Sequence, residues 1–225
     1  MIFKPWLDRW GLQPDGSPIA GTWAKLLPVL RDGEPAMLKA GMTAEEKKAL
    51  NLLAWYDGDG AVRILERDEK AILMERAVGE RSLKAMAKTG DDEGPLTVLC
   101  AAATRLHAPR TTSPPGTLVP LSVRFEPLRQ RALTHGGILA RCWTEAQSLL
   151  ATSRDERPLH GDLCHDNMRD DRRRGWLAID PKGFHGERTY DYAIMISTPE
   201  FPSARPSPEQ VQRRARHCQP KVTWC

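Results

Sequence analysis

The chain has 225 residues, of which 40% are hydrophobic and 28% charged, and its formal net charge is +4 at pH 7. This composition is typical of a soluble globular protein and excludes a disordered chain, and the length allows two lobes that share a cleft. The sequence has no apolar run long enough to span a membrane and no export signal at its N-terminus. We therefore expect a cytoplasmic protein without a membrane partner.

Cysteines and basic clusters exclude two further classes. The five cysteines are scattered and form no CxxC pair, which favours free thiols over a disulfide or zinc framework. Arginines gather at residues 172–174 and 213–216 without interleaved aromatic residues. We interpret these clusters as solvated segments and expect no nucleic-acid partner.

The N-terminal third is expected to form a small antiparallel sheet with one helix packed on it. The residue pattern predicts strands at residues 36–40, 62–66 and 71–77 and a helix at residues 43–55. Thr43 and Glu46 have the spacing of a capping box at the start of that helix. The DGDG turn at 57–60 ends it, because glycine permits positive φ.

The rest of the chain is expected to be mostly helical. Residues 78–81 form a linker, after which Ser82 can cap a helix. Apolar side chains between residues 96 and 107 recur at i, i+3, i+4 and i+7, the period of an amphipathic helix. Two more helices are expected, at about 121–134 and 137–151.

The segments LHGDLCHDNM (159–168) and WLAIDP (176–181) carry the chemistry. Asp162 and Asn167 have the spacing of the catalytic Asp and Asn in the HRDxxxxN loop of protein kinases, and Asp180 ends an apolar run. Phosphoryl transfer needs a carboxylate that orients the attacking hydroxyl and hard oxygen ligands for magnesium. The pattern predicts Asp162 as the catalytic base or orienter and Asn167 and Asp180 as Mg²⁺ ligands.

Two other interpretations of these segments stay open. Asp and Asn are common in turns, where they bond their own backbone. His160 and His165, with Asp162 and Asp166, could instead belong to a metal-dependent phosphoester hydrolase, although no ligand motif surrounds the remaining histidines. We expect His160 to be a scaffold residue whose ring bonds the loop backbone.

The segments LHGDLCHDNM and WLAIDPKGFHGERTYDYA resemble the aminoglycoside phosphotransferases, in the streptomycin 6-phosphotransferase and hydroxyurea-kinase branch. Shorter matches, such as WYDGDGAVRIL and ATRLHAPR, extend the resemblance over residues 10–193 or so. It implies an α+β, protein-kinase-like bilobal fold, with a nucleotide-binding N-lobe at 1–78 and a mostly helical C-lobe at 79–193. Residues 194–225 are expected to be a divergent or disordered tail, rich in Pro, Ser and Arg.

The resemblance also implies roles in binding ATP. Lys39 would contact the α- and β-phosphates, with Glu46 as its ion-pair partner, although Glu46 has a rival role as the cap toward Thr43. The hinge Glu75–Ala77 would meet adenine through its backbone, and a loop near Gly21–Lys25 would cover the phosphates.

The implied function is ATP- and Mg²⁺-dependent phosphorylation of an aminoglycoside, at the 6-hydroxyl of streptomycin, which confers antibiotic resistance. Because streptomycin is polycationic, Asp166, Glu187 and residues 91–93 are candidate pocket carboxylates. The sequence departs from the family at Cys164, where the branch has histidine, and after residue 193, where it ends early. A truncated, inactive kinase fold that binds nucleotide only is therefore the alternative. Oligomeric state is not indicated.

Overall fold

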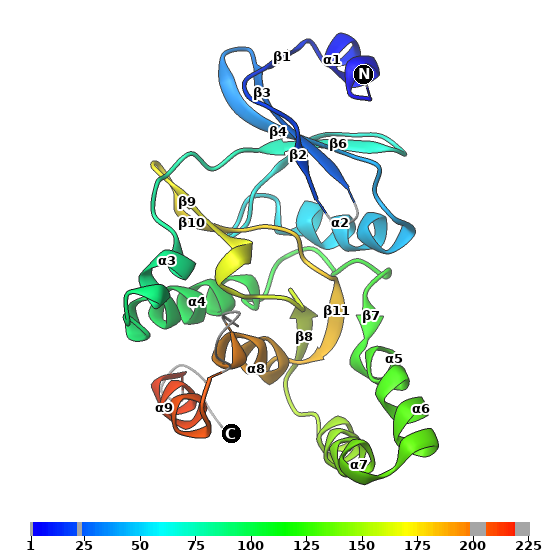
Figure 1. The fold of residues 1–225 in the computed structure, drawn as a ribbon. Coiled ribbons are helices and arrows are strands. Elements are labelled where there is room, and N and C mark those ends of the chain that lie inside the picture. Colours follow the sequence, from blue (N-terminus) through cyan, green and yellow to red (C-terminus); the bar gives the residue numbers. More distant parts are fainter. Residues whose placement is uncertain (1, 22–23, 199–205, 219–225) are drawn as a thin grey trace.

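The computed structural model describes residues 2–21, 24–198 and 206–218. They form an N-lobe built around a sheet and a C-lobe built mainly from helices, with the N-lobe at the top of Figure 1. No helix of the described residues is long and apolar enough to cross a bilayer.

The N-lobe sheet is antiparallel throughout, in the order β1-β3-β4-β6-β5, and β2 pairs with β3. Its strands are β1 (Leu12–Pro14), β2 (Ile19–Ala20), β3 (Lys25–Arg31), β4 (Glu34–Ala40), β5 (Ile64–Arg67) and β6 (Ala71–Glu75). The sequence predicted β4, β5 and β6 but not the first three strands. Pro28 in β3 obscures the strand pattern, since proline rarely lies inside a sheet.

Each face of this sheet is covered by a helix. On one side α1 (Lys4–Arg9) brings Trp6 and Leu7 against buried strand residues such as Val29 and Leu38. On the other side lies α2 (Ala44–Tyr56), which begins with the predicted capping box of Thr43 and Glu46. The sequence predicted only the second of these helices.

The apolar core of α2 is shared with the C-lobe. Leu52, Leu53 and Tyr56 belong to the same buried cluster as Leu99 and Leu106 of α4 (Glu93–Leu106). Burial of apolar surface is the main stabilising contribution to folding, so the two lobes are held together by one continuous core.

The C-lobe contains further helices and three short pairings of strands. The helices are α3 (Leu83–Lys88), α5 (Leu121–Arg124), α6 (Glu126–His135), α7 (Gly137–Ala151), α8 (Thr189–Ser197), α9 (Pro208–Cys218) and the 3₁₀ turn η1 (His165–Asn167). The strands are β7 (Val119–Pro120), β8 (Glu156–Leu159), β9 (Met168–Asp171), β10 (Gly175–Ala178) and β11 (Phe184–Glu187). Strands β9 and β10 form a hairpin, and β11 lies between β7 and β8. Ser82 caps α3 as predicted, by accepting a bond from the backbone of Ala85.

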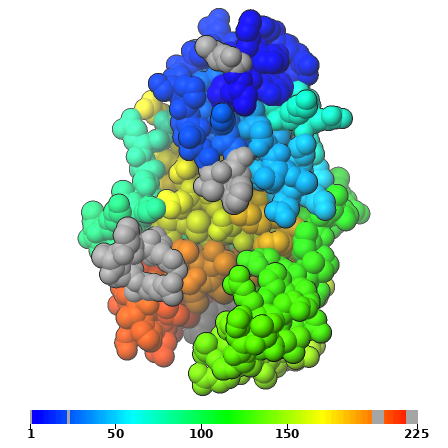
Figure 2. Space-filling model, turned by 45° about the vertical axis from the view of Figure 1, so that its right-hand side comes forward, coloured from blue at the N-terminus to red at the C-terminus, as the bar shows by residue number. Residues whose placement is uncertain are grey.

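Helices α6 and α7 form an arm that extends from the C-lobe (green in Figure 2). Each of the two buries one residue, Ala132 and Ala146 respectively, whereas Leu133, Ile138 and Leu149 are exposed. The single helix predicted at 121–134 is divided into α5 and α6 at Phe125.

Part of the segment expected to be a divergent or disordered tail is helical. In α9, Arg214 and Cys218 are buried, and Arg214 pairs with Asp92 at 2.8 Å while it donates to the carbonyls of Ile196 and Thr198. The expectation of a tail without structure is therefore wrong for Pro208–Cys218. The helix was missed because its apolar stripe is only Val211, Ala215 and Cys218.

Candidate active site

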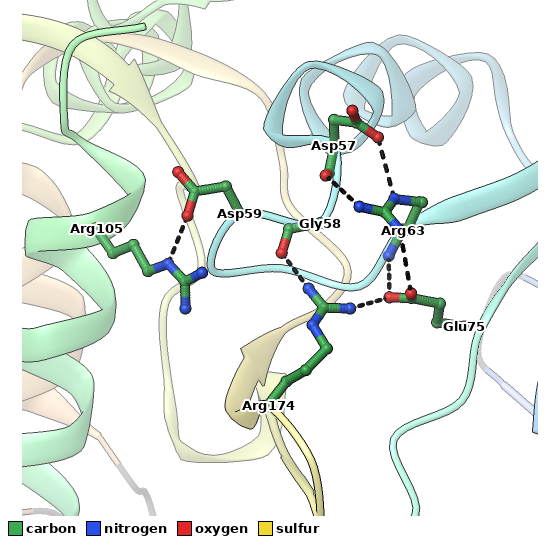
Figure 3. Close-up of a pocket in the computed structure, with 7 residues that line it drawn as sticks. All are labelled: Asp57, Gly58, Asp59, Arg63, Glu75, Arg105 and Arg174. Carbon is green, nitrogen blue, oxygen red and sulfur yellow. Dashed lines mark hydrogen bonds and ion pairs between the residues drawn. The ribbon is translucent and has the colours of Figure 1, made fainter.

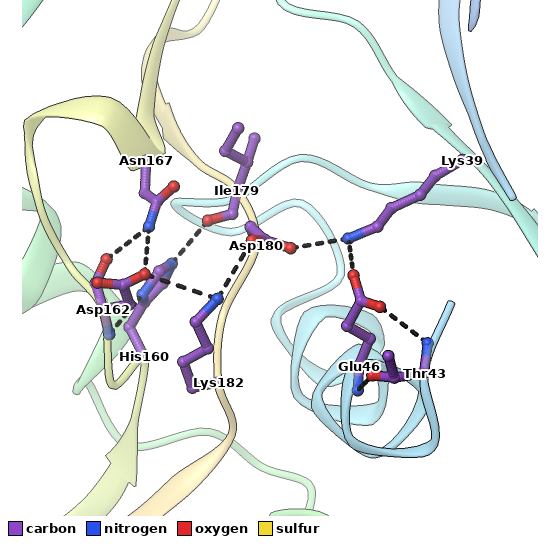
Figure 4. A network of polar contacts seen from close by, with 9 residues as sticks. All are labelled: Lys39, Thr43, Glu46, His160, Asp162, Asn167, Ile179, Asp180 and Lys182. Atoms are coloured by element: carbon purple, nitrogen blue, oxygen red, sulfur yellow. Dashed lines mark hydrogen bonds and ion pairs between the residues drawn. The ribbon is translucent and has the colours of Figure 1, made fainter. Parts of the chain in front are cut away.

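The loop that carries Asp162 connects β8 to η1 and is tied to its surroundings through His160 (Figure 4). The fully buried His160 ring contacts the carbonyl oxygen of Ile179 at 3.0 Å through Nε2 and accepts from the Asp162 backbone at 3.3 Å through Nδ1. Burial lowers the pKa of His160, although the charge of Asp191 opposes this. His160 is thus a neutral scaffold residue, and that prediction is confirmed.

Asp191 of α8 bonds the backbone of the same loop. Its Oδ1 accepts a hydrogen bond from the backbone of Gly161 at 2.7 Å, and its Oδ2 accepts one from the backbone of His160 at 3.0 Å. Nε2 of His107 lies 2.9 Å from the same Oδ2, and the Asp191 side chain is fully buried. Neither Asp191 nor His107 was predicted, and the signal that could have found Asp191 is an aspartate among the apolar residues at the start of α8.

Gly161 allows this close packing. Its φ is +81°, and a Cβ at this position would lie 2.5 Å from Cδ2 of Phe184. Only glycine fits such a conformation and approach without displacement of the loop. The residue before Asp162 is therefore determined by the fold.

Asp162 and Asn167 meet across the 3₁₀ turn. Nδ2 of Asn167 donates to the Asp162 carbonyl oxygen at 2.8 Å and to Oδ2 of its carboxylate at 3.0 Å. The amide nitrogen is thereby occupied, and the amide oxygen of Asn167 is left as the group that can act as a ligand. The Asp162 side chain is 39% exposed, so an acceptor hydroxyl can reach its carboxylate.

Asp180 joins this pair to the N-lobe. It follows β10 with φ of +56°, and the backbone of Ile179 donates to the carbonyl of Asn167 at 2.9 Å. Oδ1 of Asp180 lies 2.9 Å from Nζ of Lys39. The structure therefore brings together the three residues of the predicted phosphotransfer set with the strand lysine.

Lys39 lies between two carboxylates and is 8% exposed. Its Nζ is 2.8 Å from Oε1 of Glu46, while Oε2 of Glu46 accepts from the Thr43 backbone at 2.8 Å. The two rival roles of Glu46, ion pair and helix cap, are thus present at once. Burial acts to lower the pKa of Lys39, but the charges of Asp180 and Glu46 raise it above its usual value. Burial acts to raise the pKa of each carboxyl, yet Lys39 lowers both below their usual range.

A second lysine, Lys182, also lies in the site and was not predicted. Its Nζ is 3.3 Å from Oδ2 of Asp180 and 3.6 Å from Oδ2 of Asp162. Its position two residues after Asp180, in the motif DPKG, is the signal that could have found it.

Glu75, which was predicted to belong to the hinge, has its carboxylate in a different cluster. It forms ion pairs with Arg174 and, at 3.9 Å, with Arg63, and it accepts a bond from the Arg63 backbone at 2.8 Å. We call the set that lines this pocket the arginine cluster (Figure 3): Asp57, Gly58, Asp59, Arg63, Glu75, Arg105 and Arg174. The Glu75 carboxylate is engaged there, and its backbone amide donates to the Arg63 carbonyl at 2.9 Å, so neither group is open to a nucleotide.

Ala77 lies in the connection between the lobes. The Arg76 amide bonds the Pro35 carbonyl at 3.4 Å, and the Gly79 amide bonds the Asp170 carbonyl at 2.8 Å. Between them, the backbone groups of Ala77 form no hydrogen bond to another described residue. The expected phosphate-covering loop at Gly21–Lys25 lies partly outside the described residues, which omit 22 and 23.

The donor set fits magnesium better than a hydrolase metal centre. Asp180 and Asn167 present a carboxylate and an amide oxygen, the hard ligands that Mg²⁺ prefers, and phosphates and water usually complete its shell. Within the described ranges, no group of three or more His, Cys, Asp or Glu side chains is arranged to hold a metal ion. His165, one member of the alternative cluster, is buried, and burial and the charge of Arg214 lower its pKa to about 4.

Comparison with solved structures identifies the fold as that of small-molecule phosphotransferases. The chain is similar to an aminoglycoside 3′-phosphotransferase of type VIII, with a TM-score of 0.65 and 20% identity over 96% of this chain and 88% of that one. It is also similar to a choline/ethanolamine kinase family protein from Mesorhizobium loti, with a TM-score of 0.64 and 14% identity over 97% and 76% of the two chains. The predicted α+β, protein-kinase-like bilobal fold is confirmed.

The sequence defines the family within this fold. Residues 9–220 match the model of the aminoglycoside/hydroxyurea antibiotic resistance kinases, and the chain belongs to that family. The match includes α9 and so extends beyond the limit at about residue 193 that the motifs indicated.

Curated relatives are consistent with this assignment. The chain is 44% identical over 195 residues to a streptomycin 3″-kinase of Klebsiella pneumoniae, a match that covers 87% of this chain and 73% of the relative. It is 36% identical over 204 residues to a streptomycin 6-kinase of Streptomyces griseus, covering 85% of this chain and 64% of that protein. A hydroxyurea phosphotransferase of Kitasatospora aureofaciens is 34% identical, with 57% of its length covered.

Proposed function

We propose that the protein transfers the γ-phosphoryl group of ATP to a hydroxyl of streptomycin and thereby inactivates the antibiotic. The observation that supports this is the convergence of Asp162, Asn167 and Asp180 with the Lys39–Glu46 pair at one site between the lobes. Phosphoryl transfer depends mainly on such positioning and electrostatic stabilisation. Membership of the resistance-kinase family supports the same activity.

In this proposal ATP binds between the lobes. The backbone groups of Ala77, which bond no other described residue, are suited to the polar edge of adenine. Lys39, which two carboxylates hold in its charged form, is suited to the α- and β-phosphates. A related phosphotransferase of this fold, similar at a TM-score of 0.63, was solved with ADP and hygromycin B. Because ATP is a cytoplasmic cosubstrate, we place the reaction in the cytoplasm.

Asp162 is the group proposed to orient and deprotonate the acceptor hydroxyl. Its carboxylate is partly exposed, and the Asn167 amide fixes its rotation through Oδ2. Asn167 and Asp180 would hold magnesium, which when bound neutralises charge on the phosphates. His160 and Asp191 hold the loop backbone and take no part in proton transfer.

The position of the acceptor hydroxyl is the finer part of the proposal. We propose the 6-hydroxyl, as the sequence motifs imply, and the names of two relatives at 36% and 34% identity support it. The relative at 44% identity is a 3″-kinase by name, which favours the 3″-hydroxyl as the second candidate.

A single assay series tests the activity and the acceptor. ADP release is measured with Mg·ATP and streptomycin, other aminoglycosides or hydroxyurea, and the product is analysed by mass spectrometry and by phosphorus–proton NMR. We expect streptomycin-dependent ADP release and a product heavier by one phosphoryl group, coupled to the proton at carbon 6. Coupling at carbon 3″ would select the second candidate.

The same series separates the nucleotide-binding alternative. A thermal shift with Mg·ATP but no ADP release with any acceptor would contradict the proposed transfer and support a fold that only binds nucleotide. Cleavage of a phosphoester without ATP would support the hydrolase interpretation instead.

A further inference from the structure

Lys182 is the one described cation that forms an ion pair with Asp162, and it also pairs with Asp180. Its ammonium lies between the proposed base and a proposed metal ligand, at 3.6 and 3.3 Å (Figure 4). A cation at this place faces the point where the acceptor oxygen and the γ-phosphorus must meet if the proposed function holds.

The backbone of Lys182 is fixed on both sides. Its amide donates to the carbonyl of His160 at 2.7 Å, which joins it to the catalytic loop. The next residue, Gly183, has φ of +72°, and a Cβ there would lie 3.2 Å from Cα of Ala49 in α2. The start of the side chain is therefore fixed between the loop and α2, while its length leaves the ammonium free to reorient.

Comparison with Lys39 shows that the two lysines are held differently. The side chain of Lys39 is 10% exposed and has two contacts shorter than those of Lys182, to Glu46 and Asp180. The side chain of Lys182 is 44% exposed and its two ion pairs are longer. An ammonium with such contacts can turn toward an arriving anion without the loss of a tightly bound, buried pair.

The loop itself offers no other cation to the transferring group. Protein kinases of the HRD type and this chain share the Asp-to-Asn spacing, but the residues between Asp162 and Asn167 are Leu, Cys, His and Asp. The histidine of these four, His165, is buried, so its ring is not open to an arriving phosphoryl group. Lys182 is the described cation that contacts Asp162, whereas Lys84 pairs with Asp166 of the same loop.

We propose that Lys182 is a catalytic residue that contacts the γ-phosphoryl group during transfer, an inference that rests on the proposed function. The bond from the γ-phosphorus to the β,γ-bridging oxygen breaks, and its electron pair leaves with ADP. The acceptor oxygen forms the new bond to phosphorus, and its proton passes to the carboxylate of Asp162. The ammonium of Lys182 stabilises the negative charge on the transferring oxygens and keeps its own protons.

The test uses Lys182→Met and Lys182→Arg in the full chain, with Lys4→Met as the matched control. Lys4 also forms an exposed lysine–carboxylate pair, with Asp8 on α1, outside the cleft. We expect Lys182→Met to lower kcat about 100-fold with streptomycin, Lys182→Arg to recover part of that loss, and the control to be unchanged.

Binding provides a readout that does not need turnover. Lys182→Met should weaken binding of Mg²⁺ with a non-hydrolysable ATP analogue about 10-fold and leave Mg·ADP affinity unchanged, because only the former carries a γ-phosphate. If Lys182→Met leaves the affinity for both nucleotides unchanged, or weakens both by the same factor, the proposed role of Lys182 is overturned. Failure of the proposed function is distinct, since it shows as absence of transfer by the wild type.

Discussion

Among the described residues, two clusters of ion pairs lie between the lobes, and they are built from different cations. The site cluster pairs Lys39 and Lys182 with Glu46, Asp162 and Asp180, each by single contacts between 2.8 and 3.6 Å. In the arginine cluster, the guanidinium groups of Arg63 and Arg174 each bond several acceptors. Arg174, for example, bonds the Glu75 carboxylate and two backbone carbonyls.

This difference separates the proposed catalytic site from a cluster that links the two lobes. A guanidinium fork uses its donors on fixed planar partners, whereas an ammonium is a compact charge that can change partners. In the arginine cluster, Arg105 bonds Asp59 at 2.5 Å and thereby links the N-lobe loop to α4. At the boundary between the lobes, lysines thus lie in the site cluster and arginines in the arginine cluster, and mutations can test whether the two clusters differ in role.

The largest expected effect is on catalysis, at the site cluster. Asp162→Asn removes the proposed base while it keeps the shape, so we expect kcat to fall about 10²–10⁴-fold. The free energy of unfolding should change by less than about 0.5 kcal/mol, since the side chain is partly exposed. Coupled ADP release and urea unfolding measure the two quantities. A variant that keeps wild-type turnover would remove Asp162 from the mechanism.

Asp191 should behave as a structural residue although it lies directly beneath the catalytic loop. Asp191→Ala leaves the amides of His160 and Gly161 and the ring of His107 without their buried acceptor. We expect a loss of about 3 kcal/mol in the free energy of unfolding, because these three buried groups are left unsatisfied. Urea denaturation measures it. A loss below about 1 kcal/mol would show that the loop does not depend on this carboxylate.

His165 tests whether a titratable group inside the catalytic segment acts only on stability. Its pKa is about 4 in the folded chain against a usual value of 6.5, because it is buried and faces Arg214. The unfolded chain therefore binds more protons between these values, so stability is full above pH 6.5 and is lost as pH falls toward 4. By linkage we expect about 2–3 kcal/mol to be lost by pH 4.5.

The control for this effect is His165→Gln, which cannot titrate. Urea unfolding at pH 7, 5.5 and 4.5 should show a shallower loss for the variant than for the wild type, because both share the other titrating groups. Parallel curves would contradict the assignment.

The smallest effect is expected in the arginine cluster. Arg174→Ala removes one tie between β6 and the β9–β10 hairpin, and we expect a loss of about 1.5 kcal/mol, since the Glu75 partner is partly exposed. Turnover should stay within about threefold of the wild type. A much larger loss of kcat with unchanged stability would place this cluster in the catalytic machinery and erase the distinction from the site cluster.

The site was more predictable than the fold around it. Asp162, Asn167 and Asp180 are close in sequence, so spacing alone implied that they meet, and the capping box at Thr43 depends on residues one helical turn apart. The support given by Asp191 joins positions 31 residues apart, and its pairing with His107 joins positions 84 apart. Such contacts depend on how helices pack, which local pattern does not specify.

Helices α1 and α9 were not predicted for a similar reason, since both depend on contacts with distant segments. Helix α1 is short and its Trp6 and Leu7 become apolar cover only when the sheet is present. Helix α9 depends on Arg214, whose burial is offset by Asp92 and two carbonyls from distant segments. A buried arginine in a Pro- and Arg-rich stretch has no local signature of order.

The double role of the Glu46 carboxylate has a consequence for evolution. One of its oxygens holds Lys39 and the other closes the first turn of α2, so a single carboxylate takes part in folding and in the site. Aspartate is too short to reach both partners, and glutamine would keep the cap but lose the charge beside Lys39. Purifying selection for a stable helix and for nucleotide use would therefore act on the same codon, and drift at this position would be restricted even in a descendant that had lost its activity.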